Sequence, residues 1–212
     1  MNVSSAKENI LKKIRKALSI STPLPFPHSE GHTSVFLPSV QEPELEFAEQ
    51  FSKLQGKFIF CVDHRELVQK LNEVVKHNEW TKIYCREDKL KQNLQGNIFN
   101  DVYSDDLAGS DVAITSCELL VARTGTIVMS AAQQSGRTVS VYSPIHICIA
   151  YTNQLVYDIR DGLEMLKEKY ATGLPSMITF ASGPSRTADI EKTLVVGVHG
   201  PKEVYVFLID QK

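Results

Sequence analysis

The sequence predicts an α/β protein with a largely parallel sheet that is covered by helices on both faces. Short apolar runs at residues 58–62, 82–85 and 112–115 alternate with segments whose apolar residues recur at helical spacing. This alternation is typical of parallel strands joined by crossover helices. The length of 212 residues suits one domain, or one domain with an added arm. A chain of this length buries enough surface to fold without a disulfide or a structural metal.

Composition and charge exclude several classes of function. Hydrophobic residues make up 42% of the chain and charged residues 23%, which is ordinary for a globular protein. Because the net charge is only −2, we expect no general attraction to nucleic acid or to an anionic membrane. There is no apolar run of about 18 residues, and the first residues contain no hydrophobic signal core. We therefore expect a cytoplasmic protein without a membrane span.

The cysteines predict no metal centre in this chain. Cys61, Cys85, Cys117 and Cys148 are each more than twenty residues from the next, and no Cys-x-x-Cys pair occurs. Zinc sites and iron–sulfur clusters need closely spaced ligands, so neither is indicated. Scattered thiols in a reducing compartment are expected to be core residues.

Residues 1–43 are predicted to form an arm that is separate from the α/β domain at 44–212. Residues 6–18 have the pattern of a basic amphipathic helix. Such a helix docks on its own domain or on a partner, or lies on a membrane, and docking is the commoner case. Residues 21–43 hold five of the nine prolines, which favours an extended linker. His28 and His32 are four residues apart, but an extended segment cannot use that spacing for a metal.

The first part of the domain follows the α/β rhythm. The expected elements are a helix over 45–54 that Gly56 ends, a strand over 58–62, a helix opened by a capping box at Asp63 and Glu66, a strand over 82–85, a weak helix through Leu90 and Leu94, and a strand over 112–115.

The middle of the domain departs from this alternation of strands and helices. Residues 126–129 and 138–142 have the spacing of a hairpin joined by 131–136, which predicts a mixed sheet. A strand from Pro144 to Ala150 and a helix over 158–170 follow.

The last forty residues contain the main candidate site. Residues 177–181 and 204–209 are expected strands. Between them, Ser182-Gly183-Pro184 breaks the chain, Thr187 is a good N-cap for a helix from Ala188 to about Leu194, and a turn contains Gly197 and Gly200.

A helix that begins at such a turn presents free N–H groups. Together with Ser185, Arg186 and Thr187, these groups would suit a phosphate or a carboxylate. The alternative is that Asp189 and Glu191 occupy the first turn and pair with Arg186, which leaves no room for an anion.

Further candidates lie outside this stretch. Arg123-Thr124-Gly125-Thr126 could form a backbone nest for an anion, or a turn in which glycine supplies a positive φ and the threonines bond locally. His146 begins an apolar strand and is either a backbone-bonded histidine or a functional one. His199 lies in a turn from which a side chain can reach a cleft. The dinucleotide, P-loop, nucleophile-elbow and His-Glu-x-x-His motifs are absent from the sequence.

Four segments together resemble the LUD-domain family of lactate utilization proteins. They are Thr-Gly-Thr-Ile-Val at 124–128, Ser-Pro-Ile-His-Ile at 143–147, Gly-Pro-Ser-Arg-Thr-Ala-Asp-Ile-Glu at 183–191 and Gly-Val-His-Gly-Pro at 197–201. The resemblance covers nearly the whole chain, including the basic helix and the proline-rich arm. One position departs from it, because the family often has an acidic residue where this chain has Arg123. That change either removes a chemical group or favours a more anionic ligand.

The resemblance implies a three-layer α/β/α domain similar to the ribose-phosphate isomerase and CoA-transferase group. It also implies a subunit that acts with two iron–sulfur partner proteins in oxidising L-lactate to pyruvate, with the clusters on those partners and no cofactor in this chain. We predict that a small carboxylate or phosphate ligand binds here. The predicted ligand-binding residues are Thr124, Gly125, Thr126, His146, Gly183, Ser185, Arg186, Thr187, Asp189 and Gly200, with His199 and Glu191 as candidate catalytic residues.

Two other functions stay open at this point. The chain could be an independent enzyme for acyl or phosphate ligands on a CoA-transferase-like fold, with Glu118, Glu191 or His199 as the acid or base. It could instead be a non-catalytic scaffold whose N-terminal helix docks onto partner proteins. The resemblance does not supply a catalytic mechanism for this subunit.

Overall fold

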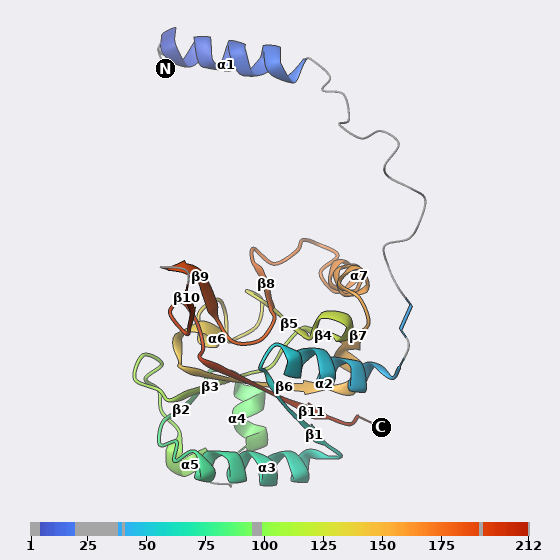
Figure 1. The fold of residues 1–212 in the computed structure, drawn as a ribbon, viewed down its shortest axis with the longest axis vertical. Coiled ribbons are helices and arrows are strands. Elements are labelled where there is room, and N and C mark those ends of the chain that lie inside the picture. Colours follow the sequence, from blue (N-terminus) through green and yellow to red (C-terminus); the bar gives the residue numbers. More distant parts are fainter. Residues whose placement is uncertain (1–4, 20–37, 40, 95–98, 191–192, 212) are drawn as a thin grey trace. The chain divides into compact units, whose positions relative to one another are not determined.

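The structure is a computed structural model that describes residues 5–19, 38–39, 41–94, 99–190 and 193–211. The chain divides into two units, Met1–Pro38 and Ser39–Lys212. The first unit contains helix α1 (Ser5–Leu18) (Figure 1). The side chains of Ile10, Leu11 and Ile14 in this helix are exposed. None of the helices within the described ranges is long and apolar enough to cross a membrane.

A parallel five-stranded sheet forms the centre of the second unit (Figure 1). All four neighbouring pairs run parallel. The strands, in their order across the sheet, are β1 (Lys57–Cys61), β11 (Glu203–Ile209), β6 (Ile145–Tyr151), β3 (Val112–Thr115) and β2 (Ile83–Cys85). In the register of this sheet, His146 lies between Ala113 of β3 and Val204 of β11.

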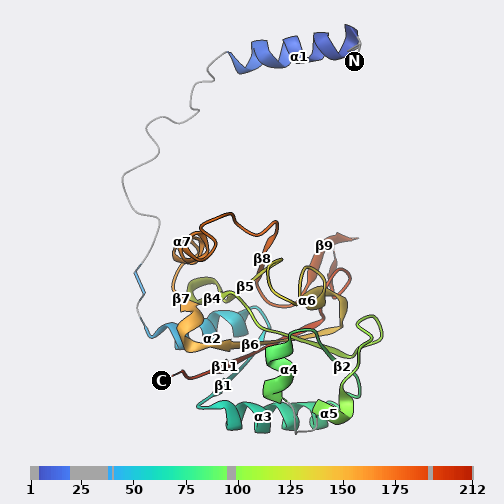
Figure 2. The same cartoon turned by 180° about the vertical axis from the view of Figure 1, so that it is seen from behind.

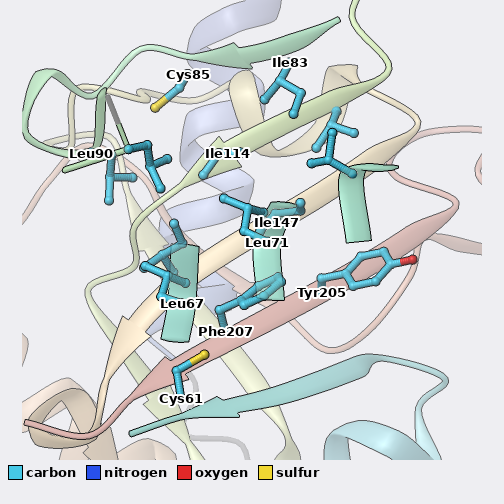
Figure 3. Packing of buried hydrophobic residues seen from close by; sticks show 14 of the residues in the cluster. Cys61, Leu67, Leu71, Ile83, Cys85, Leu90, Ile114, Ile147, Tyr205 and Phe207 are labelled. Carbon is cyan, nitrogen blue, oxygen red and sulfur yellow. The ribbon is translucent and has the colours of Figure 1, made fainter. Parts of the chain in front are cut away.

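Helices α3 (His64–His77), α4 (Asp88–Leu94) and α5 (Phe99–Val102) cover one face of the central sheet (Figure 2). Alternate residues of each strand point to this face, as strand geometry requires. Figure 3 shows the resulting core, in which helix residues pack on strand residues. Its labelled members are Cys61, Leu67, Leu71, Ile83, Cys85, Leu90, Ile114, Ile147, Tyr205 and Phe207.

The opposite face of the central sheet packs on helix α2 (Pro43–Lys53) and on a second, four-stranded sheet. The second sheet has the order β7 (Leu155–Val156), β4 (Leu119–Val121), β5 (Thr126–Ser130) and β8 (Ile178–Ala181). Phe47 and Phe51 of α2 are fully buried in the core between these layers. Helix α7 (Ile159–Lys169) covers the outer side of the second sheet, where Leu166 packs on Leu119, Val121 and Val128.

The remaining described elements are short. They are the 3-10 turns η1 (Ala122–Thr124) and η2 (Thr152–Gln154), the one-turn helix α6 (Val139–Tyr142), and the antiparallel pair β9 (Arg186–Ile190) and β10 (Thr193–Val196).

The predicted fold class is confirmed, because a mostly parallel central sheet is flanked by helices. The central sheet is formed by the apolar runs that were predicted as strands at 58–62, 82–85, 112–115, 144–150 and 204–209. Each observed boundary lies within one residue of the predicted one. The arrangement differs from a simple three-layer domain in one respect. The antiparallel pairs lie outside the central sheet, in the second sheet, where β5 pairs with β4 and β8, and in the two-stranded β9–β10 pair.

Two predicted elements are wrong. The helix expected over 188–194 does not form. The described residues of this segment belong to the antiparallel strands β9 and β10. Thr187, Ile190, Thr193 and Val195 have branched side chains that favour strands over helices, and this preference prevails over the apparent N-cap.

The hairpin expected between 126–129 and 138–142 does not form either. Residues 126–130 are a strand as expected, but residues 139–142 form helix α6. The strand partners of β5 come instead from β4 and from β8, which is about fifty residues away in the sequence. The turn residues at 131–136 therefore did not indicate which strands pair with β5.

Candidate functional site

A cavity of about 350 Å³ lies beside the amino ends of β6 and β11. Its wall includes His146 and Val204, which are the second residues of these strands. The other side is formed by β8 with the loop after it and by the turn that precedes β11. Of the predicted site residues, His146, Gly183, Ser185, Arg186, His199 and Gly200 line this one cavity.

Two segments that are distant in sequence form one wall of the cavity. Ser185 donates its backbone N–H to the Pro201 carbonyl at 2.9 Å, and Gly197 donates to the Ser185 carbonyl at 2.9 Å. A Cβ on Gly200 would lie 2.9 Å from the Cβ of Ser185. The loop at 182–185 and the turn at 197–201 therefore need a glycine at position 200 to approach each other this closely.

Arg186 contributes a positive charge to the lining of this cavity. Its Nη2 donates a hydrogen bond to the Leu54 carbonyl at 2.6 Å, and Leu54 is the C-cap of α2. A guanidinium at a helix C-terminus interacts favourably with the helix dipole. Since one N–H group is used in this way and arginine has five, the side chain retains donors for a ligand.

Glu191 lies outside the described residues, and so does the side chain of Asp189. The alternative in which one of these carboxylates pairs with Arg186 therefore stays a prediction. Thr187 follows Arg186 in β9 and is not among the residues that line the cavity. Its predicted N-cap role is wrong because no helix begins there.

His146 is buried in the wall of the cavity, with 2% of its surface exposed. Its Nε2 lies 2.8 Å from the Thr115 hydroxyl. Burial lowers the pKa of His146 to about 4, because desolvation disfavours the charged imidazolium. The ring is therefore neutral near pH 7, and a neutral imidazole offers a ligand one donor or one acceptor.

His199 is an exposed residue of the turn before β11 and lines the same cavity. The turn is held by the hydrogen bonds of Ser185 and by the backbone N–H of Lys202, which donates to the Pro144 carbonyl at 2.7 Å. The structure thus has His199 beside the cavity, and a functional role for this residue stays a prediction.

The segment Thr124-Gly125-Thr126 adjoins the cavity without lining it. Gly125 has φ +57°, and a Cβ there would lie 2.5 Å from the backbone nitrogen of Phe51. The Thr124 and Thr126 hydroxyls are 2.7 Å apart, and the Thr126 hydroxyl is 2.7 Å from that of Ser182. The turn therefore packs closely on α2. The hydroxyls of Thr124, Thr126 and Ser182 form a chain that ends at the cavity. Direct ligand contact by Thr124, Gly125 and Thr126 stays a prediction.

Ser182 lines the cavity but was missing from the predicted ligand set. The only sequence signal for it was its place in the break before Gly183 and Pro184. Gly183 has φ +77°, and a Cβ there would lie 2.7 Å from the Leu54 carbonyl oxygen. The loop thus packs closely on the end of α2, and this contact places the Ser182 hydroxyl beside Thr126.

Arg123 and Glu118 have partners away from the cavity. The Nε of Arg123 lies 2.6 Å from Oδ2 of Asp158, the buried N-cap residue of α7. The side chain of Glu118 is almost fully buried and accepts hydrogen bonds from Ser130, Tyr170 and Lys169. Burial raises the pKa of this carboxyl, but these three donors together lower it below its usual value. Neither residue lines the cavity.

Metal ligands do not gather in the described part of the chain. Among these residues no group of three or more His, Cys, Asp or Glu side chains could hold a metal ion. The four cysteines are buried and free.

The cavity is suited chemically to a small anion. It offers a guanidinium, the hydroxyls of Ser182 and Ser185, a neutral imidazole and an exposed histidine, and the described residues of its lining include no carboxylate. Such donors bind phosphate and carboxylate groups. The fold and the cavity together therefore define an α/β protein with a candidate anion site between two sheets.

Comparison with known proteins gives the family. The model of the LUD domain matches residues 45–209, so the chain belongs to the LUD-domain family. Proteins named "Lactate utilization protein C" are similar to it. The one from Deinococcus radiodurans is 35% identical over 105 residues, and the one from Bacillus subtilis is 36% identical over 105 residues.

The extent of these matches is limited. The match to the Deinococcus radiodurans protein covers 49% of each chain, and the match to the Bacillus subtilis protein covers 48% of this chain and 44% of that protein. The chain thus spans about half the length of the curated relatives it matches. A crystal structure of a DUF162 family protein from Deinococcus radiodurans is similar in fold, with a TM-score of 0.61 and 18% identity. That similarity covers 82% of this chain and 99% of the other.

Proposed function

We propose that this protein takes part in lactate utilization and that its cavity between the two sheets binds a small carboxylate or phosphate. In this proposal it is a subunit of a cytoplasmic system that oxidises L-lactate to pyruvate, and iron–sulfur partner proteins carry the electrons. Membership of the LUD-domain family and the names of the similar proteins support the pathway. The composition of the cavity wall supports the ligand class.

The observation that carries the ligand proposal is the joining of two distant segments around one cavity. Residues 182–186 and 197–201 are held together by backbone hydrogen bonds, and they bring Arg186 and His199 to the same cavity as His146. Arg186 supplies a positive charge to a ligand, while hydroxyls supply orientation. A neutral His146 accepts or donates a hydrogen bond without adding charge.

Calorimetric titration of the full chain with L-lactate, pyruvate and inorganic phosphate tests this proposal. Arg186→Ala is expected to weaken binding of the accepted anion by about 1.5–3 kcal/mol, the range for hydrogen bonds to charged groups. Arg186→Lys should recover only part of the affinity, because lysine keeps the charge but lacks the planar fork. Arg65→Ala is a matched control, since it removes an exposed positive charge from α3 on the other side of the central sheet.

Thermal unfolding of the same variants separates ligand binding from stability. Because Arg186 also bonds the Leu54 carbonyl, we expect Arg186→Ala to cost about 1 kcal/mol of stability in addition to affinity. Lower stability with unchanged affinity for every anion would mean that Arg186 serves only the end of α2. Absence of binding by all three anions would reject the ligand proposal.

The partner proposal has its own experiment. Anaerobic purification of the tagged chain together with the two candidate partners should give a complex that contains iron and acid-labile sulfide. The chain purified alone should contain neither in stoichiometric amount. An iron-containing complex that reduces an artificial acceptor with L-lactate would support the proposed pathway, whereas partners that never associate with the chain would contradict it.

A further inference from the structure

A second cavity of about 400 Å³ adjoins the first one. Both cavities are lined by Val141, His199 and Gly200, so these three residues form a shared wall. We call the first the inner cavity and the second the outer cavity. The outer cavity continues along Tyr142, Pro144, Gly197, Val198 and Lys202.

The two cavities differ in chemistry. The inner one offers Arg186 and serine hydroxyls, while the outer one offers the ring of Tyr142 and two valine side chains beside Lys202. Val141, Tyr142 and Val198 in the outer cavity are 40%, 63% and 46% exposed. Adjacent exposed apolar side chains beside a cavity mark a binding surface more often than isolated ones do. An exposed tyrosine ring in particular offers a face on which a flat ring can stack.

Each of the two cavities is lined by a positively charged residue. Arg186 lines the inner cavity and Lys202 lines the outer one, and no carboxylate is found among the lining residues whose side chains the structure describes. His199 lies in the wall between them. A ligand that follows both cavities would therefore meet cations along its length and an apolar surface in the outer part.

We propose that the two cavities form one elongated site for a phosphate that carries a flat aromatic ring, the chemistry of a nucleoside monophosphate. The phosphate would occupy the inner cavity beside Arg186, and the ring would stack on Tyr142 in the outer cavity. This inference rests on the proposed anion site and extends it, because a small anion alone would leave the outer cavity without a role.

Calorimetry on the full chain with inorganic phosphate, adenosine and adenosine 5′-monophosphate tests the inference. The nucleotide should bind about 5- to 150-fold more tightly than phosphate, the factor that corresponds to about 1–3 kcal/mol of base–aromatic stacking. Adenosine should bind more weakly than the nucleotide because it lacks the anion. Tyr142→Ala should abolish the advantage of the nucleotide while leaving phosphate affinity unchanged, and Tyr142→Phe should restore it. Met165→Ala, which removes an exposed apolar side chain from α7, is the control.

The outcomes test the elongated site separately from the proposed anion site on which it rests. Equal affinity for phosphate and nucleotide would overturn the elongated site and leave the anion site standing. The same would follow if Tyr142→Ala did not change nucleotide affinity. If adenosine bound as tightly as the nucleotide, the phosphate position would be wrong. Absence of binding by phosphate and nucleotide alike would reject both proposals.

Discussion

His146 links the cavity to the stability of the fold at the scale of a single residue. It lies on the face of β6 that it shares with Cys148 and Ala150, which points toward the second sheet. Its pKa is about 4 in the folded protein, compared with a usual value near 6.5 in an unfolded chain. The folded state therefore binds fewer protons than the unfolded state between these two values.

This difference predicts how stability depends on pH. The contribution of neutral His146 is fully present above about pH 6.5 and is lost as the pH falls toward about 4, for a total of about 3 kcal/mol. Denaturant titrations at pH 7 and pH 4.5 measure the loss. His146→Gln should show a smaller decrease over this range than the parent chain, because glutamine does not titrate. Identical decreases in both proteins would contradict the assigned burial of the imidazole.

Gly125 shows how one residue without a side chain positions an element. Gly125 and Gly136 both have positive φ values, +57° and +66°. A Cβ at Gly125 would collide with the backbone of Phe51, whereas a Cβ at Gly136 would have no heavy atom within 4 Å. A side chain at Gly136 would therefore meet backbone strain alone, whereas a side chain at Gly125 would meet backbone strain and a close packing contact.

Alanine substitutions at these glycines form a matched pair. Gly136→Ala should cost about 1–2 kcal/mol, the strain of a left-handed residue with a side chain. Gly125→Ala should cost about 2–5 kcal/mol, because overpacking against α2 adds to the same strain. The midpoints of urea unfolding measure the difference. Equal costs would show that α2 can move away from the turn without loss.

At the scale of elements, ionic contacts join α7 to the second sheet at both of its ends. Asp158 at its start pairs with Arg123, and Lys169 and Tyr170 at its end bond Glu118. Glu118 also accepts a hydrogen bond from Ser130 of β5. These contacts supplement the apolar packing of Leu166 on the sheet.

Glu118→Gln is expected to destabilise the protein by about 1–3 kcal/mol, because three donors lose a charged acceptor. Lys169→Ala should cost about 1 kcal/mol or less, since the lysine side chain is 59% exposed and water screens its charge. The lowered pKa of Glu118 also means that its contribution is lost as the pH falls below about 4.3 and through the folded value. Thermal melts of both variants at pH 7 and pH 3.5 check the order, and a larger loss for Lys169→Ala would contradict it.

The elements that the sequence predicted well are those with unambiguous patterns. β3, β6 and β11 are buried on both faces, and their residues form nearly continuous apolar runs. β1 lies at the edge of the sheet and is only partly buried, but its residues 58–61 are also an apolar run. The β9–β10 pair was missed because Thr187 with acidic residues after it imitates a helix start. β4 (Leu119–Val121) was not predicted. The strand partners of β5 depend on packing between distant segments, which local periodicity does not encode.

The site was predictable in its segments and less so in its contacts. Glycine-containing turns indicated that residues 182–186 and 197–201 were special, and both line the inner cavity. The orientation of single side chains was not predictable, because it depends on how the two sheets pack. Arg123 faces α7 for this reason, and Ser182 reaches the cavity. The cavity also lies at the amino ends of β6 and β11, whereas the usual rule for parallel sheets points to the carboxyl ends.

At the scale of the whole molecule, the chain consists of an N-terminal unit and a unit that carries the candidate site. The second unit begins at Ser39, whose hydroxyl bonds Glu46 of α2. Helix α2 is integral to that unit, because Phe47 and Phe51 are fully buried and its end is bonded by Arg186. The position of a truncation should therefore decide between an intact and a broken fold.

Removal of residues 1–38 should leave the second unit folded, with a cooperative thermal transition within a few degrees of the full chain, because the described residues of its three hydrophobic clusters all follow residue 38. Removal of residues 1–54 is the contrasting variant. It deletes α2 and should abolish the cooperative transition, since burying a phenylalanine contributes about 1.5–3 kcal/mol and two would be lost. Circular dichroism melts compare the two. Partner binding should decrease in the shorter truncation if α1 docks on another protein. An insoluble or molten 39–212 chain would show instead that the N-terminal unit is needed to complete the fold.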